Sequence, residues 1–301
     1  MQMNSLGKSD LQVSPVSFGC MSLGESAAQY KDMLRRAVEA GINYFDTADL
    51  YQKGLNELHV GETLKPIRKN VIIATKVGNQ WRPDGSGWDW NPSKEYILKC
   101  AEQSLRRLKT DYIDLYQLHG GTIDDPIDET IEAFELLKQQ GKIRWYGISS
   151  IRPNVIREYV KRSNIVSVMM QYSLLDHRPE EEVLDLLHQH DISVICRGAV
   201  AQGLLVGKPA ANYLQYTDGE VARAAKMVAK VAAESGLTKL EVALGYVWSH
   251  PAVATAALGM RTSAQLDEAI HALRHATPLS AAQRTALRQS VRSYHYDAHK
   301  T

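Results

Sequence analysis

Four side chains whose types suit proton transfer lie at or just beyond the ends of short apolar segments. Asp46 and Tyr51 come directly after the first of these segments. Lys76 lies near the end of a second segment, and His119 directly follows a third. If the three segments are neighbouring strands of a parallel sheet, their carboxyl ends share one edge. We then expect the four side chains to lie within contact of one another.

These residue types together predict acid–base chemistry on an oxygen. Lys76 follows a stretch of buried strand, where an unpaired ammonium is costly, so it needs an anion, and Asp46 is the nearest candidate. A positive charge there favours the phenolate form of Tyr51, which lets the phenol act as a general acid near neutral pH. His119 is placed to hydrogen-bond a substrate oxygen. Each residue alone is more often structural, and Asp46 would equally serve as a helix cap. Their joint occurrence favours a site that protonates a developing alkoxide.

Strand-like apolar segments alternate with helical patterns along the whole chain. A hairpin is expected around Gly7–Ser14, and the helix at 30–40 should end at Gly41, a natural cap. Segments 78–91 and 198–219 are expected to be loops. Strands are predicted at 16–20, up to Asp46, and at 71–77, 112–118, 143–148, 166–172, 192–196 and 253–258; helices are predicted at 30–40, 56–64, 93–108, 127–140, after Pro153, and at 179–190, 220–234, 239–248, 263–273 and 280–294.

This alternation predicts the α/β class, and within it an eight-stranded parallel (β/α)8 TIM barrel with extra C-terminal helices. Two open sheets are the competing architecture. A dinucleotide-binding sheet needs a Gly-x-Gly-x-x-Gly turn after its first strand, and Gly19 and Gly24 have the wrong spacing. No compositional break divides the chain. We therefore expect residues 1–301 to form a single barrel domain.

The composition excludes several classes of protein. The 301 residues are 44% hydrophobic, with 35 basic and 34 acidic side chains, so a nucleic-acid footprint is not expected. The 3 cysteines are far apart, which argues against a disulfide framework. No signal peptide and no membrane-spanning apolar run are recognised. We expect a soluble cytoplasmic protein, monomeric or weakly homo-oligomeric, that binds a small molecule and neither nucleic acid nor a membrane.

Several spaced motifs resemble signatures of the aldo-keto reductase superfamily across essentially the whole chain. They are GINYFDTADLY at 41–51, IATK at 73–76, DLYQLH at 114–119, GKIRWYGISS at 141–150 and QYSLL at 171–175. The resemblance implies that Tyr51 is the general acid, that Asp46 and Lys76 tune it, and that His119 orients the carbonyl. It also implies a nicotinamide dinucleotide that supplies a hydride while bound without a Rossmann domain.

The same resemblance implies which residues hold the cofactor. Ser149, Ser150 and Gln171 match positions that bind the nicotinamide carboxamide. The segment after strand seven matches the family's pyrophosphate-binding loop. The segment after strand eight matches the segment that binds the adenosine 2′-phosphate. Arg261 there predicts NADPH over NADH, with a solvated surface arginine as the alternative. The candidates in these two segments are Gly198, Val200, Gln202, Gly203, Lys208, Gly259, Arg261, Gln265 and Glu268.

Two positions depart from the family pattern. Arg197 replaces the aromatic residue that often stacks on the nicotinamide, and an arginine plane can also stack or reach the pyrophosphate. Ala269 replaces the usual asparagine near the adenine, so one adenine contact is expected to be missing.

The substrate side is expected in the tryptophan-rich segment after strand three. Trp81, Trp88 and Trp90 would form an apolar wall over a carbonyl substrate, or else pack their loop onto the barrel rim, and Met21 would face the same pocket. No metal is expected, because His188 and His190 lie two apart on a helix and cannot share a face.

Two other functions compete with an NADPH-dependent carbonyl reductase. One is a cofactor-binding, redox-sensing regulatory subunit with the same fold. The other is a barrel enzyme in which Lys76 forms a Schiff base, which would need no nicotinamide. The Asp46 and Tyr51 context argues against the Schiff base.

Overall fold

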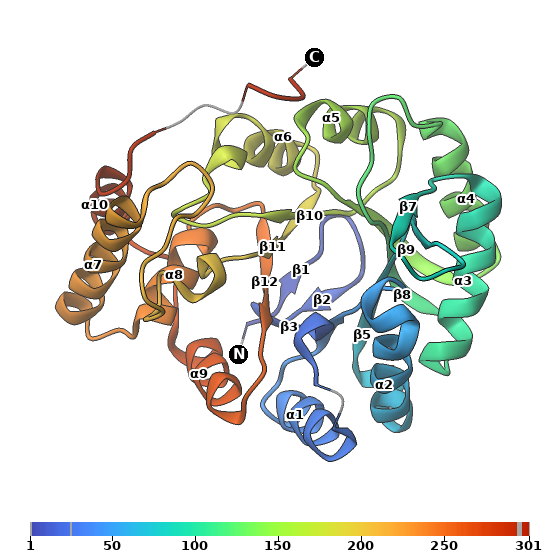
Figure 1. The fold of residues 1–301 in the computed structure, drawn as a ribbon, viewed down its shortest axis with the longest axis horizontal. Helices are drawn as coiled ribbons and strands as arrows, with labels where there is room; N and C mark the ends of the chain where they lie inside the picture. Colours follow the sequence, from blue (N-terminus) through green and yellow to red (C-terminus); the bar gives the residue numbers. More distant parts are fainter. Residues whose placement is uncertain (1, 25, 294–296, 301) are drawn as a thin grey trace.

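A closed barrel of parallel strands forms the centre of the computed structural model, which describes residues 2–24, 26–293 and 297–300 (Figure 1). The strand order around the barrel is β10-β11-β12-β3-β4-β5-β8-β9, which confirms the predicted (β/α)8 fold. The strands are β3 (Val16–Gly19), β4 (Tyr44–Asp46), β5 (Ile72–Val77), β8 (Ile113–Leu118), β9 (Ile143–Ser149), β10 (Ser167–Gln171), β11 (Ser193–Arg197) and β12 (Val253–Gly259).

Helices surround the barrel, and their apolar faces pack on the outward-facing side chains of the strands (Figure 1). Met33, Leu34 and Ala37, for example, form the buried face of α1. Within the described ranges, no helix is long and apolar enough to cross a membrane. The α-helices are α1 (Ala27–Glu39), α2 (Leu55–Leu64), α3 (Lys94–Leu108), α4 (Ile127–Gln139), α5 (Pro153–Arg162), α6 (Val183–Gln189), α7 (Asp218–Ser235), α8 (Lys239–Trp248), α9 (Ser263–His275) and α10 (Ala281–Gln289).

The N-terminal hairpin, β1 (Asn4–Ser5) and β2 (Gln12–Val13), closes one end of the barrel. Leu6 and Leu11 are buried in one apolar cluster with barrel residues such as Tyr44. Gly7 has φ +56°, and a Cβ there would lie 2.3 Å from the Val166 carbonyl oxygen. The hairpin therefore packs tightly against the strands and covers the barrel interior at this end.

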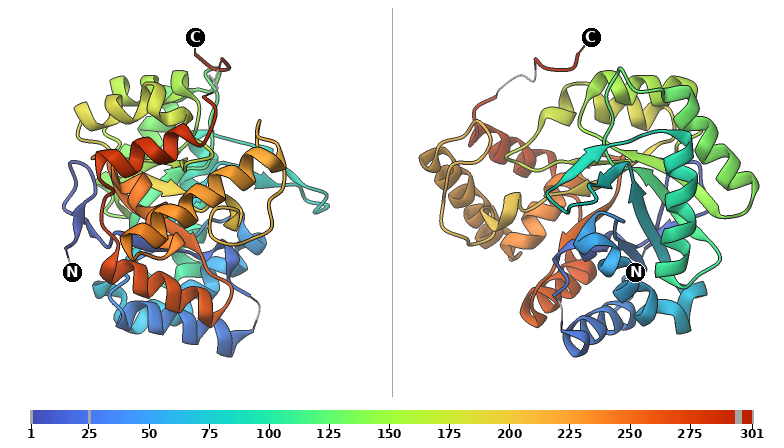
Figure 2. Two further views of the ribbon diagram at one scale, coloured as in Figure 1. Left: turned by 90° about the vertical axis from the view of Figure 1, so that its left-hand side faces the viewer. Right: turned by 45° about the vertical axis from the view of Figure 1, so that its right-hand side comes forward.

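Three predicted elements differ from the structure. Segment 78–91, expected to be a loop, contains the antiparallel hairpin β6 (Asn79–Trp81) and β7 (Trp88–Trp90). This hairpin stands out on the side of the molecule opposite β1 and β2 (Figure 2). Its turn contains Gly85 with φ +73°, and an Arg82–Asp89 ion pair at 2.6 Å joins its strands.

The other two differences concern helices. The helix predicted at 179–190 is a 3-10 turn, η4 (Arg178–Glu181), followed by the short α6. Glu182 between them has φ −156°, which interrupts the helix. The last predicted helix, 280–294, is wrong at its end, because α10 stops at Gln289 and Ser290 caps it. Its predicted last residue, Tyr294, lies outside the described residues.

Candidate active site

Three adjacent strands bring the predicted acid–base residues together. Asp46 of β4 pairs in register with Ala74 of β5, and Lys76 of β5 pairs with Gln117 of β8. His119 follows β8 directly. All of these positions are at the carboxyl ends of parallel strands, where barrel enzymes place their active sites.

Lys76 is the centre of this cluster. Its side chain is 1% exposed, and its Nζ lies 2.5 Å from Asp46 Oδ1, 2.7 Å from the Thr47 carbonyl oxygen and 3.4 Å from the Tyr51 hydroxyl. Burial alone would lower the pKa of Lys76, but the neighbouring Asp46 carboxylate outweighs it and raises that pKa above its usual value. Gln117 also donates to Asp46 Oδ2 at 3.3 Å. The ammonium is thus held, charged, between an acid and a phenol.

Tyr51 is placed by an unusual turn. It begins η2 (Tyr51–Gly54), in which Gln52, Lys53 and Gly54 have φ of 51°, 54° and 87°. Such left-handed conformations cost energy in residues with side chains and recur at active sites. A Cβ at Gly54 would lie 2.8 Å from the Arg107 side chain, so only glycine fits without displacing that arginine.

Buried polar residues at the start of α2 hydrogen-bond to the strands and loops next to the Tyr51 turn. Asn56 accepts from the Thr47 hydroxyl at 2.6 Å and donates to the Cys20 carbonyl at 2.8 Å. Glu57, fully buried, accepts from Thr75 and from Arg107, each at 2.6 Å. Sequence reasoning missed these residues. Two adjacent polar residues inside a predicted helix would have been the signal, because buried polar groups need partners.

His119 is a neutral imidazole beside the Tyr51 ring. Its ring approaches Tyr51 edge-on, with 5.9 Å between the ring centres. Burial lowers the pKa of His119 to about 3, and the nearby charges of Lys76 and Arg197 contribute. Its buried Nδ1 has no hydrogen-bond partner among the described residues. A buried polar atom without a protein partner needs another partner, such as water or a ligand.

Asp49, between Asp46 and Tyr51, is a buried acid that sequence reasoning did not select. Burial, and to a smaller extent the neighbouring Glu57 carboxylate, raises the pKa of Asp49 to about 8. Asp49 Oδ1 has no partner among the described side chains. Asp49 is therefore mainly protonated and uncharged at neutral pH, which avoids the cost of a buried, unpaired carboxylate.

Gln171 and Arg197 form a polar platform at the ends of β10 and β11, where they pair in register. Arg197 Nη1 donates to Gln171 Oε1 at 3.1 Å, and Gln171 Nε2 donates to the Tyr213 hydroxyl at 2.9 Å. Gly198 has φ +73°, and a Cβ there would lie 3.1 Å from Gln171 Cγ. Tyr213, in the loop after β11, was not predicted, because nothing in its local sequence indicates this partner.

Two serines lie at the carboxyl end of β9, the strand that pairs with β10. Ser149 ends β9 and is half-buried, whereas Ser150 is buried and its hydroxyl accepts the Arg152 backbone N–H at 3.1 Å. Ser149 is thus the more accessible of the two for a ligand at this edge.

The loop after β11 turns sharply and carries a free cation. Ala201 and Gln202 have φ of 46° and 58°, and Gly203 has φ 93°. Val200 accepts the Gly203 N–H through its backbone carbonyl at 2.9 Å. Lys208 is exposed, and no described acidic side chain pairs with it. The loop therefore exposes glycine-rich backbone together with one ammonium group.

The start of α9 presents a second cation. Thr262 caps the helix by accepting the Gln265 N–H at 3.2 Å, and Gln265 Oε1 accepts the Arg261 N–H at 2.8 Å. The Arg261 guanidinium is exposed and has no acidic partner within the described ranges. Gly259 before it lies so close to Ser22 that a Cβ would be 2.7 Å from its hydroxyl. Glu268 is exposed one turn into the helix.

The candidate pocket residues differ in their surroundings. Trp81 Nε1 donates to the Leu50 carbonyl at 3.3 Å, so this tryptophan lies beside the Tyr51 turn. Trp90 donates to Asp125 at 2.9 Å and covers Gly78 and Gly120, whose added Cβ atoms would lie 2.5 Å and 3.3 Å from its ring. Trp88 and Met21 are 49% and 63% exposed. Trp90 thus anchors the hairpin, Trp81 lies beside the Tyr51 turn, and Trp88 and Met21 are exposed to solvent.

The residues present fit a bound nicotinamide dinucleotide. The unpaired cations Lys208 and Arg261 lie after neighbouring strands β11 and β12, suitable for separate phosphates. His119, whose Nδ1 has no partner among the described residues, lies beside Tyr51, and Arg197 of the platform is close enough to influence the His119 pKa. Lys208 and Arg261 would thus bind phosphates of a dinucleotide, and Gln171 and Arg197 would be available for its other polar groups.

Comparisons with known proteins show which family the chain resembles. A sequence model of the aldo/keto reductase family matches residues 15–292. The chain is 51% identical over 310 residues to the uncharacterized oxidoreductase YqkF of Bacillus subtilis, covering 100% of each. The solved aldo-keto reductase AKR11C1 from Bacillus halodurans, in its holo form, is similar with a TM-score of 0.93, 51% identity and 100% coverage of both chains. The NADH-specific methylglyoxal reductase of Escherichia coli is 33% identical over 229 residues, 69% of this chain and 70% of that protein.

Proposed function

The chain belongs to the aldo/keto reductase family and is an NAD(P)H-dependent oxidoreductase, and from this we propose that it reduces small aldehydes or ketones with NADPH, using Tyr51 as the general acid. One observation carries the proposal. The buried Lys76 ammonium contacts both the Asp46 carboxylate and the Tyr51 hydroxyl. This arrangement stabilises negative charge on the phenol oxygen, which a proton donor to an alkoxide requires.

The side chains divide the work of the proposed reaction. The bound cofactor supplies the hydride to the carbonyl carbon. Tyr51 releases its proton to the carbonyl oxygen, and Lys76 compensates the charge left on the phenol oxygen. Asp46 keeps the ammonium in place, and neutral His119 donates a hydrogen bond to the substrate oxygen, which fixes its orientation. In this proposal Trp81, beside the Tyr51 turn, and the exposed Trp88 and Met21 would contact a small apolar substrate.

We assign the cofactor contacts by position. Ser149, Ser150, Gln171 and Arg197 would hold the nicotinamide end, and the loop from Gly198 to Lys208 the pyrophosphate. The unpaired Arg261 guanidinium at the start of α9 supports a 2′-phosphate contact and thus NADPH. A relative named as NADH-specific makes this preference the part of the proposal that needs testing first.

We further propose that residues 1–301 form one domain and act in the cytoplasm. The described cysteines, Cys20, Cys100 and Cys196, are all buried and free, which fits a reducing compartment.

The test is consumption of NADPH and, in parallel, of NADH against a panel of small aldehydes, ketones and dicarbonyls that includes methylglyoxal. Turnover that prefers NADPH supports the whole proposal. Turnover that prefers NADH keeps the reductase and overturns the role of Arg261. Tight NADPH binding without turnover of any panel member overturns the reductase proposal in favour of a redox-sensing regulatory subunit.

A further inference from the structure

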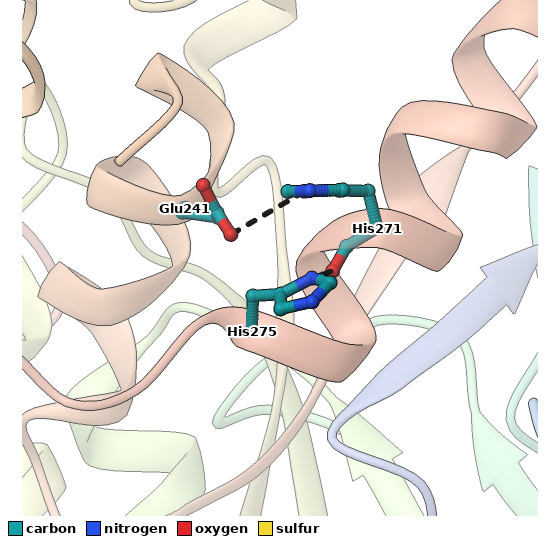
Figure 3. Close-up of side chains that lie close together, drawn as sticks. All are labelled: Glu241, His271 and His275. Atoms are coloured by element: carbon teal, nitrogen blue, oxygen red, sulfur yellow. Dashed lines mark hydrogen bonds and ion pairs between the residues drawn. The ribbon is translucent and has the colours of Figure 1, made fainter. Parts of the chain in front are cut away.

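Two helices bring together a carboxylate and two imidazoles away from the proposed active site. Glu241 lies in the first turn of α8, and His271 and His275 lie on the last turns of α9 (Figure 3). One ligand atom from each residue lies within 4.8 Å of the others. Glu241 is 2% exposed, whereas both histidines are exposed. The cluster thus has a buried anion on one side and an opening to solvent on the other.

The two histidines share one face of α9 because they are four residues apart. Their rings lie 4.2 Å apart between centres. His275 Nδ1 lies 2.8 Å from the His271 backbone carbonyl, which can only accept, so Nδ1 carries the proton. The lone pair of neutral His275 is therefore on Nε2. Metal-binding histidines typically make this same hydrogen bond to a backbone carbonyl, which orients the free nitrogen toward the metal.

Glu241 is oriented in a similar way by the helix it begins. Its Oε2 accepts the Thr238 N–H at 2.6 Å as part of a capping box. Its Oε1 lies 3.4 Å from His271 Nδ1, longer than an ordinary N–H···O bond. Two ligands bound to tetrahedral zinc at about 2.0–2.2 Å are themselves roughly 3.3–3.5 Å apart. The Glu241–His271 pair therefore already has the separation of two zinc ligands.

We propose that Glu241, His271 and His275 bind a zinc-type divalent cation that joins α8 to α9, with water completing the coordination. Two imidazoles and one carboxylate suit Zn²⁺ and its neighbours Cu²⁺, Ni²⁺ and Co²⁺, whereas Mg²⁺ and Ca²⁺ prefer all-oxygen sites. The cation would neutralise a carboxylate that is nearly excluded from water. His275 has to move toward the other two ligands, which its exposed position allows.

The test is titration of the full-length, untagged, chelator-treated protein with Zn²⁺ by calorimetry, with Co²⁺ absorption as a second readout. His275→Ala should weaken Zn²⁺ binding at least about tenfold, the lower range found even for the loss of an outer-shell partner. Glu241→Gln removes the carboxylate charge and should weaken Zn²⁺ binding to a similar extent. Its amide oxygen can still accept the Thr238 N–H, so the helix cap is kept. His190→Ala, which replaces the exposed histidine that caps the end of α6, is the matched control and should leave binding unchanged.

The outcomes separate a site from adventitious binding. One equivalent of Zn²⁺, a tetrahedral Co²⁺ spectrum, and loss of both in the two cluster variants support the proposal. Binding that survives in both variants, or that falls equally in His190→Ala, overturns it, as does no binding at micromolar Zn²⁺. Melting without metal shows that each variant folds. NADPH turnover should be the same with and without zinc, because the cluster contains none of the proposed catalytic residues.

Discussion

The Lys76 ammonium contacts three different oxygens, and among them only the Tyr51 hydroxyl carries a proton that it can donate. The others are the Asp46 carboxylate and the Thr47 carbonyl, at 2.5 Å and 2.7 Å. At the scale of single residues, the proposed chemistry therefore depends on one phenol and on the charge beside it.

Replacing Tyr51 with phenylalanine should separate chemistry from binding. The variant keeps the ring, so we expect NADPH affinity within about twofold of the wild type. Loss of a general acid should lower kcat by about 10²–10⁴-fold. Steady-state rates and a fluorescence titration of NADPH measure the two effects. Near-normal turnover would remove Tyr51 from the acid role.

The buried carboxyl group of Asp49 predicts a pH dependence of stability. Its pKa is about 8 in the folded protein and about 3.9 in an unfolded chain. The folded state therefore binds more protons between these values, and its stability falls as the pH rises from about 4 to 8. Asp49→Asn stays neutral and should not show this loss.

Urea unfolding at pH 5 and pH 9 measures the difference. At each pH, the free energy of unfolding of the wild type is subtracted from that of Asp49→Asn. This difference should be more positive at pH 9 than at pH 5 by at least about 1 kcal/mol. Asp111→Asn, which replaces an exposed carboxylate, is the control. The same offset from the wild type at both pH values would contradict a neutral Asp49.

At the scale of elements, the start of α9 determines the cofactor preference in our proposal. Arg261→Ala should raise KM for NADPH about 10–100-fold, because a charge-assisted hydrogen bond is worth about 1.5–3 kcal/mol. KM for NADH should change little, since NADH has no 2′-phosphate. Arg223→Ala removes an exposed arginine of α7 and controls for net charge. An equal rise for both cofactors would mean that Arg261 does not contact a 2′-phosphate.

At the scale of the whole molecule, the N-terminal hairpin should contribute to stability and not to catalysis. Gly7→Ala places a Cβ 2.3 Å from the Val166 carbonyl oxygen in a left-handed conformation, so we expect a loss of about 2 kcal/mol or more. Gly141→Ala has a similar φ, +71°, with nothing within 4 Å, and isolates the conformational cost. Thermal unfolding compares the two.

The kcat of folded Gly7→Ala should equal that of the wild type, because the hairpin closes the end of the barrel away from Lys76. A lowered kcat at a temperature where the variant is fully folded would show that the hairpin also influences the site.

The barrel and the clustering of Asp46, Tyr51, Lys76 and His119 at its strand ends could be predicted because they depend on local patterns. Each strand is a short apolar run, and the chemistry follows directly at its end, as with Asp46 and His119. The β6–β7 hairpin could not be predicted, because its segment has too few apolar residues for a strand pattern and is fixed by Trp90 packing on Gly78 and Gly120. Asn56, Glu57 and Tyr213 were missed because their partners are distant in sequence.

The hairpin that closes one end of the barrel has a consequence for how this chain can evolve. This hairpin packs so closely on the residues inside the barrel that few substitutions fit, as Gly7 shows. In the β6–β7 hairpin at the other end, Trp88 and most of the turn residues are exposed, so substitutions at those positions cost little folding free energy. If the chain reduces carbonyl compounds as proposed, natural selection or a mutant library could alter its substrate range by changing the β6–β7 hairpin, while the N-terminal hairpin at the other end maintains the fold.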